Sequence, residues 1–231
     1  MKLLLFDLDG TILHATHGAG RVPFDLAMRD VFGVDVELRR TRPDGKTDPC
    51  IVTELLAQAG VAAAADDAAL AAFHERLSAR LAEAIAGGAT RVEAVLGVRR
   101  LLEAVARDAG IALAVLTGNL EGAAELKLRA AGLERFFPVG AFGSDHAERG
   151  ELPEVARVRH RVRSGVDVAL ADCVIIGDTP LDHAAAQRNG MPCVLVASGR
   201  IPLAELLTLR PAAAFGDWND AGAIHAALAR L

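Results

Sequence analysis

The sequence predicts an α/β protein built on a doubly wound parallel sheet, with a small all-helical cap inserted after the first strand. Two observations lead to this prediction. From residue 94 onward, short apolar segments alternate with helical patterns, which is typical of a parallel sheet covered by helices. Between residues 14 and 88, apolar residues recur only at helical spacing. We therefore expect a Rossmann-like core of residues 1–13 and 89–231 and a helical cap of residues 14–88.

The elements of the core are expected in a regular order. The first strand is apolar from Leu3 to Phe6 and reaches Asp7. A helix carrying Val98 and Leu101 follows the cap. After it, the expected strands span residues 112–116, 138–142, 173–177, 193–196 and 212–215, and the expected helices span residues 120–131, 151–163, 182–189 and 219–230. This alternation predicts parallel strands.

The segment 14–88 is expected to contain helices and no strand. Its apolar residues fall into three helical groups: Phe24, Met28, Val31 and Phe32; Ile51, Val52, Leu55 and Leu56; and Leu70, Phe73, Leu77, Leu81 and Ile85. Asp48 followed by Pro49 is typical of a helix N-cap and a first-turn proline, and Gly60 would end that helix. Residues 61–65 are expected to connect it with the next cap helix.

Composition limits the class of protein. A chain of 231 residues with 52% hydrophobic content can bury a full core. Its net charge of −5 argues against a nucleic-acid partner or a membrane surface, which require a clustered basic face. The sequence has no apolar run of spanning length and no signal-peptide pattern, so we expect a cytoplasmic monomer or dimer. Three widely spaced cysteines are expected to be reduced.

Polar side chains follow three of the expected strands. Asp7 and Asp9 follow the first strand, Thr117-Gly118-Asn119 the second and Asp178 with Asp182 the third. Burying ionised carboxylates costs several kcal/mol unless a metal, hydrogen bonds or a substrate compensates. Ligands of open α/β sheets gather at the carboxyl ends of strands, so these groups are expected to lie together. The alternative is that Asp7 and Asp9 only form a turn and cap a helix.

These motifs resemble those of the haloacid dehalogenase-like hydrolases, and within them the phosphoglycolate phosphatase-like members. The matching segments are Asp7-Leu8-Asp9-Gly10-Thr11, Leu116-Thr117-Gly118-Asn119 and Gly177-Asp178-Thr179-Pro180-Leu181-Asp182. The resemblance covers nearly the whole chain, including the order and spacing of its motifs. It implies that Asp7 attacks phosphorus to give an aspartyl-phosphate, and that Asp9 protonates the leaving oxygen and then activates water.

The expected reaction requires positive charge. A dianionic phosphate ester and an attacking carboxylate repel each other, so the site must supply cations and fixed donors. Mg²⁺ fits best, because Asp7, Asp178 and the backbone carbonyl of Asp9 offer the oxygen ligands that it prefers. We therefore expect a Mg²⁺-dependent phosphatase acting on a small phosphorylated substrate. Thr117, Gly118 and Asn119 are expected to hold phosphate oxygens at the start of a helix, although Asn119 is equally well explained as a helix cap.

One motif departs from the family pattern. Relatives commonly carry a Lys-Pro pair opening a helix, whereas the chain has only three lysines and none at that place. Arg149 is our candidate for the missing cation, the alternative being a surface arginine. Asp182 lies one helical turn after Asp178, and it could hold a water molecule or Arg149, or simply stabilise the first turn of a helix.

Substrate choice is expected to come from the cap. Its basic loop over residues 39–47 contains Gly45 and Lys46, and Lys46 could reach an anionic substrate, although a solvated run of charges explains the loop as well. Two other functions stay open. A phosphomutase shares both aspartates but must protect its phosphorylated intermediate from water, and a catalytically silent protein would use the same fold to sense phosphate or bind a partner.

Overall fold

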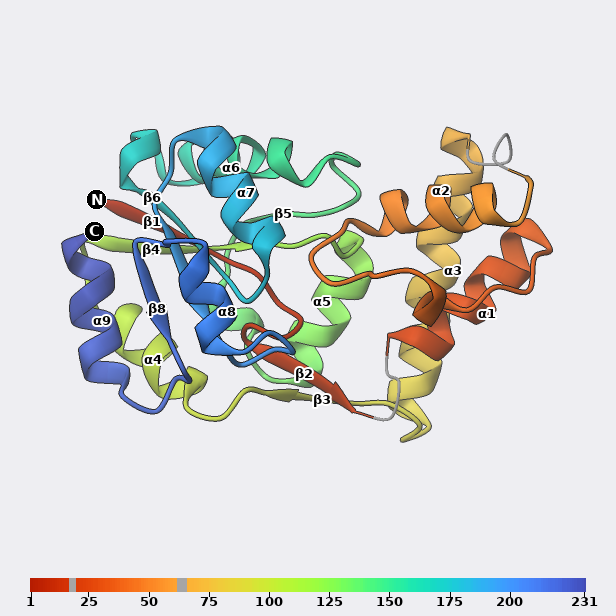
Figure 1. Cartoon of the computed structure of the whole chain (residues 1–231), viewed down its shortest axis with the longest axis horizontal. Coiled ribbons are helices and arrows are strands. Elements are labelled where there is room, and N and C mark those ends of the chain that lie inside the picture. Colours follow the sequence, from red (N-terminus) through yellow and green to blue (C-terminus); the bar gives the residue numbers. More distant parts are fainter. Residues whose placement is uncertain (17–19, 62–65) are drawn as a thin grey trace.

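The computed structural model describes residues 1–16, 20–61 and 66–231. In these ranges a core with one large sheet lies beside a helical cap (Figure 1). The sheet contains six parallel strands in the order β5-β4-β1-β6-β7-β8. They are β1 (Lys2–Phe6), β4 (Ile111–Leu116), β5 (Gly140–Ala141), β6 (Cys173–Gly177), β7 (Cys193–Val196) and β8 (Ala213–Phe215). The predicted α/β fold with a parallel sheet is confirmed.

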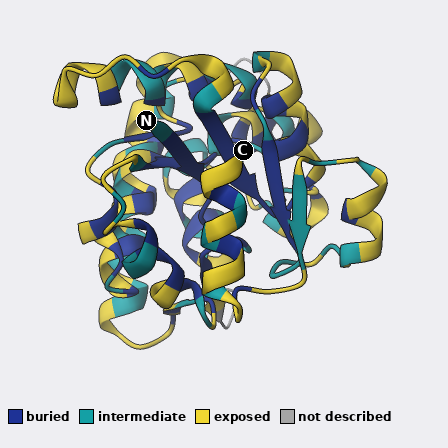
Figure 2. Cartoon of the chain, turned by 90° about the vertical axis from the view of Figure 1, so that its left-hand side faces the viewer, coloured by how far each residue is buried: buried dark blue, intermediate teal, exposed yellow. Residues whose placement is uncertain are grey.

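The strands are apolar because helices cover both faces of the sheet. Leu3 and Leu5 face one side, where they pack with α6 (Leu152–Ser164), α7 (Pro180–Asn189) and α8 (Leu203–Thr208). Leu4 and Phe6 face the other side with α4 (Val98–Val105), α5 (Glu121–Ala130) and α9 (Ala221–Arg230). In Figure 2 the central strands of the sheet are buried, while the outward faces of the helices are exposed. The sheet is therefore doubly wound.

The strand order positions the polar segments found in the sequence. β1 lies between β4 and β6, and Phe6 at its end is level with Val115 and Ile176. The three chains leave these neighbouring strands at the same edge of the sheet. Asp7, Thr117 and Asp178 are each the first residue after a strand, so the fold brings them together.

The cap consists of α1 (Arg21–Phe32), α2 (Asp48–Gln58) and α3 (Asp67–Ala86), with a short 3-10 helix η1 (Leu38–Arg40) between the first two. Their apolar faces enclose a separate core that includes an edge-to-face contact of Phe24 and Phe73, with ring centroids 4.9 Å apart. Leu120 and Ala123, at the beginning of α5, belong to this same cluster. The cap therefore packs against the core at the beginning of α5.

Some local predictions were wrong. β2 (Leu13–Thr16) pairs in antiparallel fashion with β3 (Arg91–Ala94), so the segment 14–88 begins with strand residues. Each strand has four residues and its partner is distant in the chain, so no hairpin turn signals the pairing. α8 was also not expected. The N-cap of α2 is Thr47 and not Asp48, because the Thr47 hydroxyl accepts a hydrogen bond from the amide of Cys50.

The remaining features are short helices, free cysteines and the character of the helices. The remaining 3-10 helices are η3 (Glu134–Phe136), η4 (Arg149–Glu151) and η5 (Leu170–Asp172). Of the connection expected at 61–65, residues 62–65 lie outside the described residues. All three cysteines are free, as expected. Among the described residues, every helix is too short or too polar to cross a bilayer.

Candidate active site

The carboxyl edge of the sheet faces a cavity of about 660 Å³ between core and cap. Every residue that the sequence singled out for catalysis, phosphate binding or specificity lines this cavity: Asp7, Asp9, Gly45, Lys46, Thr117, Gly118, Asn119, Arg149 and Asp178. Asp182 lies just behind it and is fully buried. A cavity lined by convergent polar groups is the usual setting of an active site.

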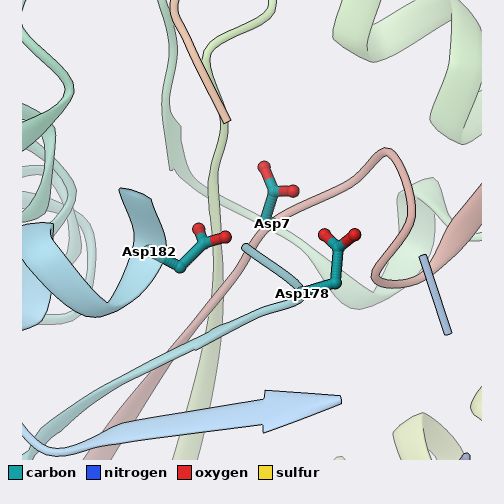
Figure 3. Close-up of side chains that lie close together, drawn as sticks. All are labelled: Asp7, Asp178 and Asp182. Atoms are coloured by element: carbon teal, nitrogen blue, oxygen red, sulfur yellow. The ribbon is translucent and has the colours of Figure 1, made fainter. Parts of the chain in front are cut away.

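Asp7 and Asp178 form the centre of the site, and these residues are 5% and 4% exposed. Together with Asp182 they surround a common space, and one carboxylate oxygen of each lies within 4.8 Å of the others (Figure 3). The hydroxyl of Thr11 donates to Oδ1 of Asp178 at 2.9 Å. Gly10, with φ +84°, lets the chain turn so close to Asp178 that a Cβ on it would lie 2.4 Å from Oδ2.

Arg149 compensates the charge of these carboxylates. It opens η4, which is tied to α7 by a hydrogen bond from Asn189 to the carbonyl of Gly150. Its Nη2 lies 3.0 Å from Oδ1 of Asp7 and also pairs with Asp182. Arg149 therefore lies between Asp7 and Asp182, and it is not a surface residue, since 8% of it is exposed.

Asp182 contacts Arg149 and also stabilises the first turn of a helix, two of the roles that the sequence suggested for it. One oxygen pairs with Arg149. The other accepts hydrogen bonds from the amide and the hydroxyl of Thr179, while the Asp182 amide donates back to the hydroxyl, which gives a capping box at the start of α7. Both oxygens of Asp182 are thus occupied, so Asp7 and Asp178 are the carboxylates with oxygens left for a cation.

The electrostatics of the site call for such a cation. Burial raises the pKa of Asp7 to about 7, and the nearby charge of Arg149 opposes this shift. Burial, and then the charges of Asp7 and Asp182, raise the pKa of Asp178 to about 8. Three carboxylates with one guanidinium leave an excess of negative charge. An oxygen-ligated divalent cation fits these residues, because it would neutralise that charge.

Asp9 lies in a different environment. The chain turns after β1, and the Asp9 carboxylate meets Lys127 and Asn119 on the side of α5, with Nζ of Lys127 2.6 Å from Oδ2. Burial alone would raise the pKa of Asp9, but the charge of Lys127 and the hydrogen bonds from Lys127 and Asn119 outweigh it and lower that pKa. Sequence reasoning missed Lys127, although helical spacing from Ala123 places it on the buried face of α5.

The turn at Thr117 differs from the expectation in one respect. α5 begins at Glu121, so Asn119 precedes the helix and does not cap it. The first amides of this helix are already bound by the cap, since Leu120 donates to Asp48 at 2.9 Å and Gly122 donates to Nε2 of His74 at 3.1 Å. Asp48 was missed as a site residue. Its pKa is raised to about 6 by burial.

The cap loop reaches into the site through its backbone. Gly45 has φ +77°, and its carbonyl accepts a hydrogen bond from Nη1 of Arg149 at 3.2 Å. The ammonium of Lys46 pairs with Glu54 of α2, so it is not a free cation in this structure. Arg200 from the core lies 3.5 Å from Asp44 of the loop. The loop is thus held to the core at Asp44 and at Gly45.

Comparison with known proteins gives the family. The family model of the haloacid dehalogenase-like hydrolases matches residues 4–187. The phosphoglycolate phosphatase of Rhodospirillum rubrum is 32% identical to the chain over 223 residues, which is 94% of the chain and 90% of that protein. The chain therefore belongs to the haloacid dehalogenase-like hydrolases, and it is a phosphatase, a phosphoric monoester hydrolase.

Solved structures share the fold. The crystal structure of CbbY from Rhodobacter sphaeroides in complex with phosphate has a TM-score of 0.67 at 22% identity, over 96% of both chains. The crystal structure of a hydrolase from Pseudomonas syringae has a TM-score of 0.70 at 19% identity, over 95% of both chains. At these identities the likeness concerns the arrangement of sheet, helices and cap.

The close approach of Gly10 to Asp178 leads to a prediction. Gly10→Ala should destabilise the protein by more than about 2 kcal/mol, because the left-handed backbone is strained and the new Cβ collides with a buried carboxylate. Gly33→Ala is the matched control, since Gly33 has φ +67° with open space around it, and it should cost only about 1 kcal/mol. Urea unfolding of both variants measures the difference. Equal losses of unfolding free energy in the two variants would show that the collision with Asp178 does not add to the cost.

Proposed function

We propose that the chain is a Mg²⁺-dependent phosphatase that hydrolyses a small phosphorylated metabolite through an aspartyl-phosphate at Asp7. The observation that carries the proposal is the position of Asp7: a carboxylate directly after the central strand, held by Arg149 and lining the cavity. A guanidinium at this place reduces the repulsion between an anionic nucleophile and a phosphoryl group. Thr117, Gly118 and Asn119 would hold phosphoryl oxygens beside it.

The proposed reaction has two steps. Asp7 attacks phosphorus, the bond to the ester oxygen breaks, and Asp9 gives that oxygen a proton. Water then attacks the phosphorus of the aspartyl-phosphate while Asp9 takes its proton, which releases inorganic phosphate and restores the Asp7 carboxylate. The negative charge of an incoming phosphoryl group raises the pKa of Asp9 again, so this residue can carry the proton that the first step needs.

Mg²⁺, which phosphatases of this family generally use, would supply positive charge to the phosphoryl oxygens when bound by Asp7, Asp178 and the backbone carbonyl of Asp9. Asp182 would support the site from behind by orienting Arg149. These assignments rest on the free carboxylate oxygens and on the negative charge that Arg149 alone leaves unbalanced.

For the substrate we propose a small organic acid phosphate, with phosphoglycolate as the first compound to test. A relative aligned with almost the whole chain is a phosphoglycolate phosphatase. Cationic side chains around the cavity favour a substrate with a second negative group. Arg21 and Arg42 line it from the cap, whereas Arg39, Lys46 and Arg200 are paired with Glu37, Glu54 and Asp44. Gly45 and Lys46 would contribute to this choice, since their loop closes the cavity beside Arg149.

The nucleophile is tested by Asp7→Asn. Turnover should fall at least about a thousandfold, or roughly 4 kcal/mol, because the amide cannot form the covalent intermediate. Stability should not fall, because the substitution removes one charge from a crowded buried cluster. Phosphate release and thermal unfolding are the measurements, with exposed Asp35→Asn as control. Activity within tenfold of the wild type would exclude Asp7 as nucleophile.

The metal is tested by Asp178→Ala. Asp178 and Asp172 flank β6 at its carboxyl and amino ends, so Asp172→Ala removes an equivalent charge far from the cavity and is the matched control. Calorimetry should show Mg²⁺ binding to the wild type and to Asp172→Ala, and none to Asp178→Ala. Chelation should abolish phosphate release. Unchanged Mg²⁺ affinity in Asp178→Ala, or full activity with chelator, would contradict the assignment.

The role of Arg149 is tested by three variants. Arg149→Ala should lower turnover roughly a hundredfold or more, the scale of one lost charged contact in the transition state. Arg149→Lys should recover only part of the lost turnover, because an ammonium does not reproduce the planar fork that contacts Asp7, Asp182 and Gly45. Arg157→Ala is the control, because Arg157 pairs with Glu154 and Asp167 on the far side of α6. Unchanged turnover in Arg149→Ala would show that Arg149 takes no part in the reaction.

A further inference from the structure

Lys127 is a buried lysine on a helix face that is otherwise apolar. It is 6% exposed and shares the inner face of α5 with Ala123, Ala124 and Leu128. Lysine is almost never buried to this extent unless its ammonium is paired, because removing the charge from water is costly. The residue therefore has a specific electrostatic task at the place where it is buried.

That task concerns Asp9. Nζ of Lys127 lies 2.6 Å from Oδ2 of Asp9 and 2.6 Å from Oδ1 of Asn119. Asn119 completes a triangle, since its Nδ2 donates to the same oxygen of Asp9 at 2.8 Å, and it reaches Thr117 Oγ1 at 2.9 Å. Two donors thus fix one oxygen of Asp9. Within the described residues, no donor contacts its other oxygen, Oδ1.

We infer that Lys127 is a positioning residue for Asp9: with Asn119 it holds Oδ2 and leaves Oδ1 free to exchange a proton with the ester oxygen of the substrate. This inference rests on the proposed role of Asp9 as acid and base. It assigns different tasks to the two oxygens of one carboxylate. It also explains why the chain places a lysine on the buried face of the helix that follows Thr117.

Proton delivery matters only when the leaving oxygen is basic. An alkoxide leaves poorly without a proton, whereas a dinitrophenolate is stable as an anion and leaves unaided. A misplaced Asp9 should therefore slow formation of the aspartyl-phosphate from an alkyl phosphate and leave that step unchanged for dinitrophenyl phosphate. Loss of a structural residue, or of a contact with the phosphoryl group or the metal, would slow both substrates alike.

The test is Lys127→Met, which keeps an unbranched side chain and removes the ammonium. The quantity measured is kcat/KM, which covers the steps up to formation of the covalent intermediate, for phosphoglycolate and for dinitrophenyl phosphate. We expect a loss of roughly a hundredfold with phosphoglycolate and less than about threefold with dinitrophenyl phosphate. Lys127→Arg should have a kcat/KM for phosphoglycolate at least tenfold above that of Lys127→Met, because a guanidinium can again donate to Asp9.

Arg129→Met is the matched control, since it removes a cation from the exposed face of the same helix and should leave both substrates unaffected. Equal losses with both substrates, or no loss with either, would overturn the inference. Thermal unfolding of each variant identifies a loss caused by misfolding. The Asp7→Asn variant tests the proposed function separately: if it still hydrolyses both esters, the covalent mechanism fails regardless of Lys127.

Discussion

The arrangement at the carboxyl edge depends on the pairing of Arg149 with buried carboxylates. Its guanidinium bridges Asp7 and Asp182 in a buried place, where an unpaired charge would be costly. Buried ion pairs of this kind contribute little to stability compared with apolar packing, so their presence indicates a functional demand. The surroundings hold both partners in place. The capping box fixes Asp182, and Asn189 fixes the turn that carries Arg149.

Two carboxylates that are neighbours in sequence acquire opposite properties from this arrangement. Asp7 is buried on the Arg149 side of the site, and burial raises its pKa to about 7. Asp9 lies past the end of β1, where Lys127 and Asn119 outweigh burial and lower its pKa. Pairs of acids whose environments separate their pKa values are suited to different tasks in one reaction. The end of β1 at Phe6 creates this separation, because the chain leaves the strand direction before Asp9, whose carboxylate meets Asn119 and Lys127 instead.

The sequence predicted the sheet well because its strands are buried on both faces and therefore read as continuous apolar segments, as at Leu3–Phe6. That Asp7, Asp178 and Arg149 lie together could be predicted, because they come directly after strands or before a helix. Lys127 and Asp48 were missed because their partners are remote, 118 residues away for Asp9 and 72 for Leu120. Such contacts leave no local pattern. The β2–β3 ribbon escaped detection for the same reason.

The cap completes the site with its backbone and with buried polar groups more than with free charges. The carbonyl of Gly45 accepts a hydrogen bond from Arg149, and Asp48 and His74 bind the first amides of α5. Any movement that separates cap from core must break these bonds and expose their partners. Arg149 and the helix after the Thr117 turn are therefore both coupled to the position of the cap. In the mechanism that we propose, water must be excluded from phosphoryl transfer until Asp9 directs it, so this coupling would link enclosure of the substrate to the arrangement that reacts with it.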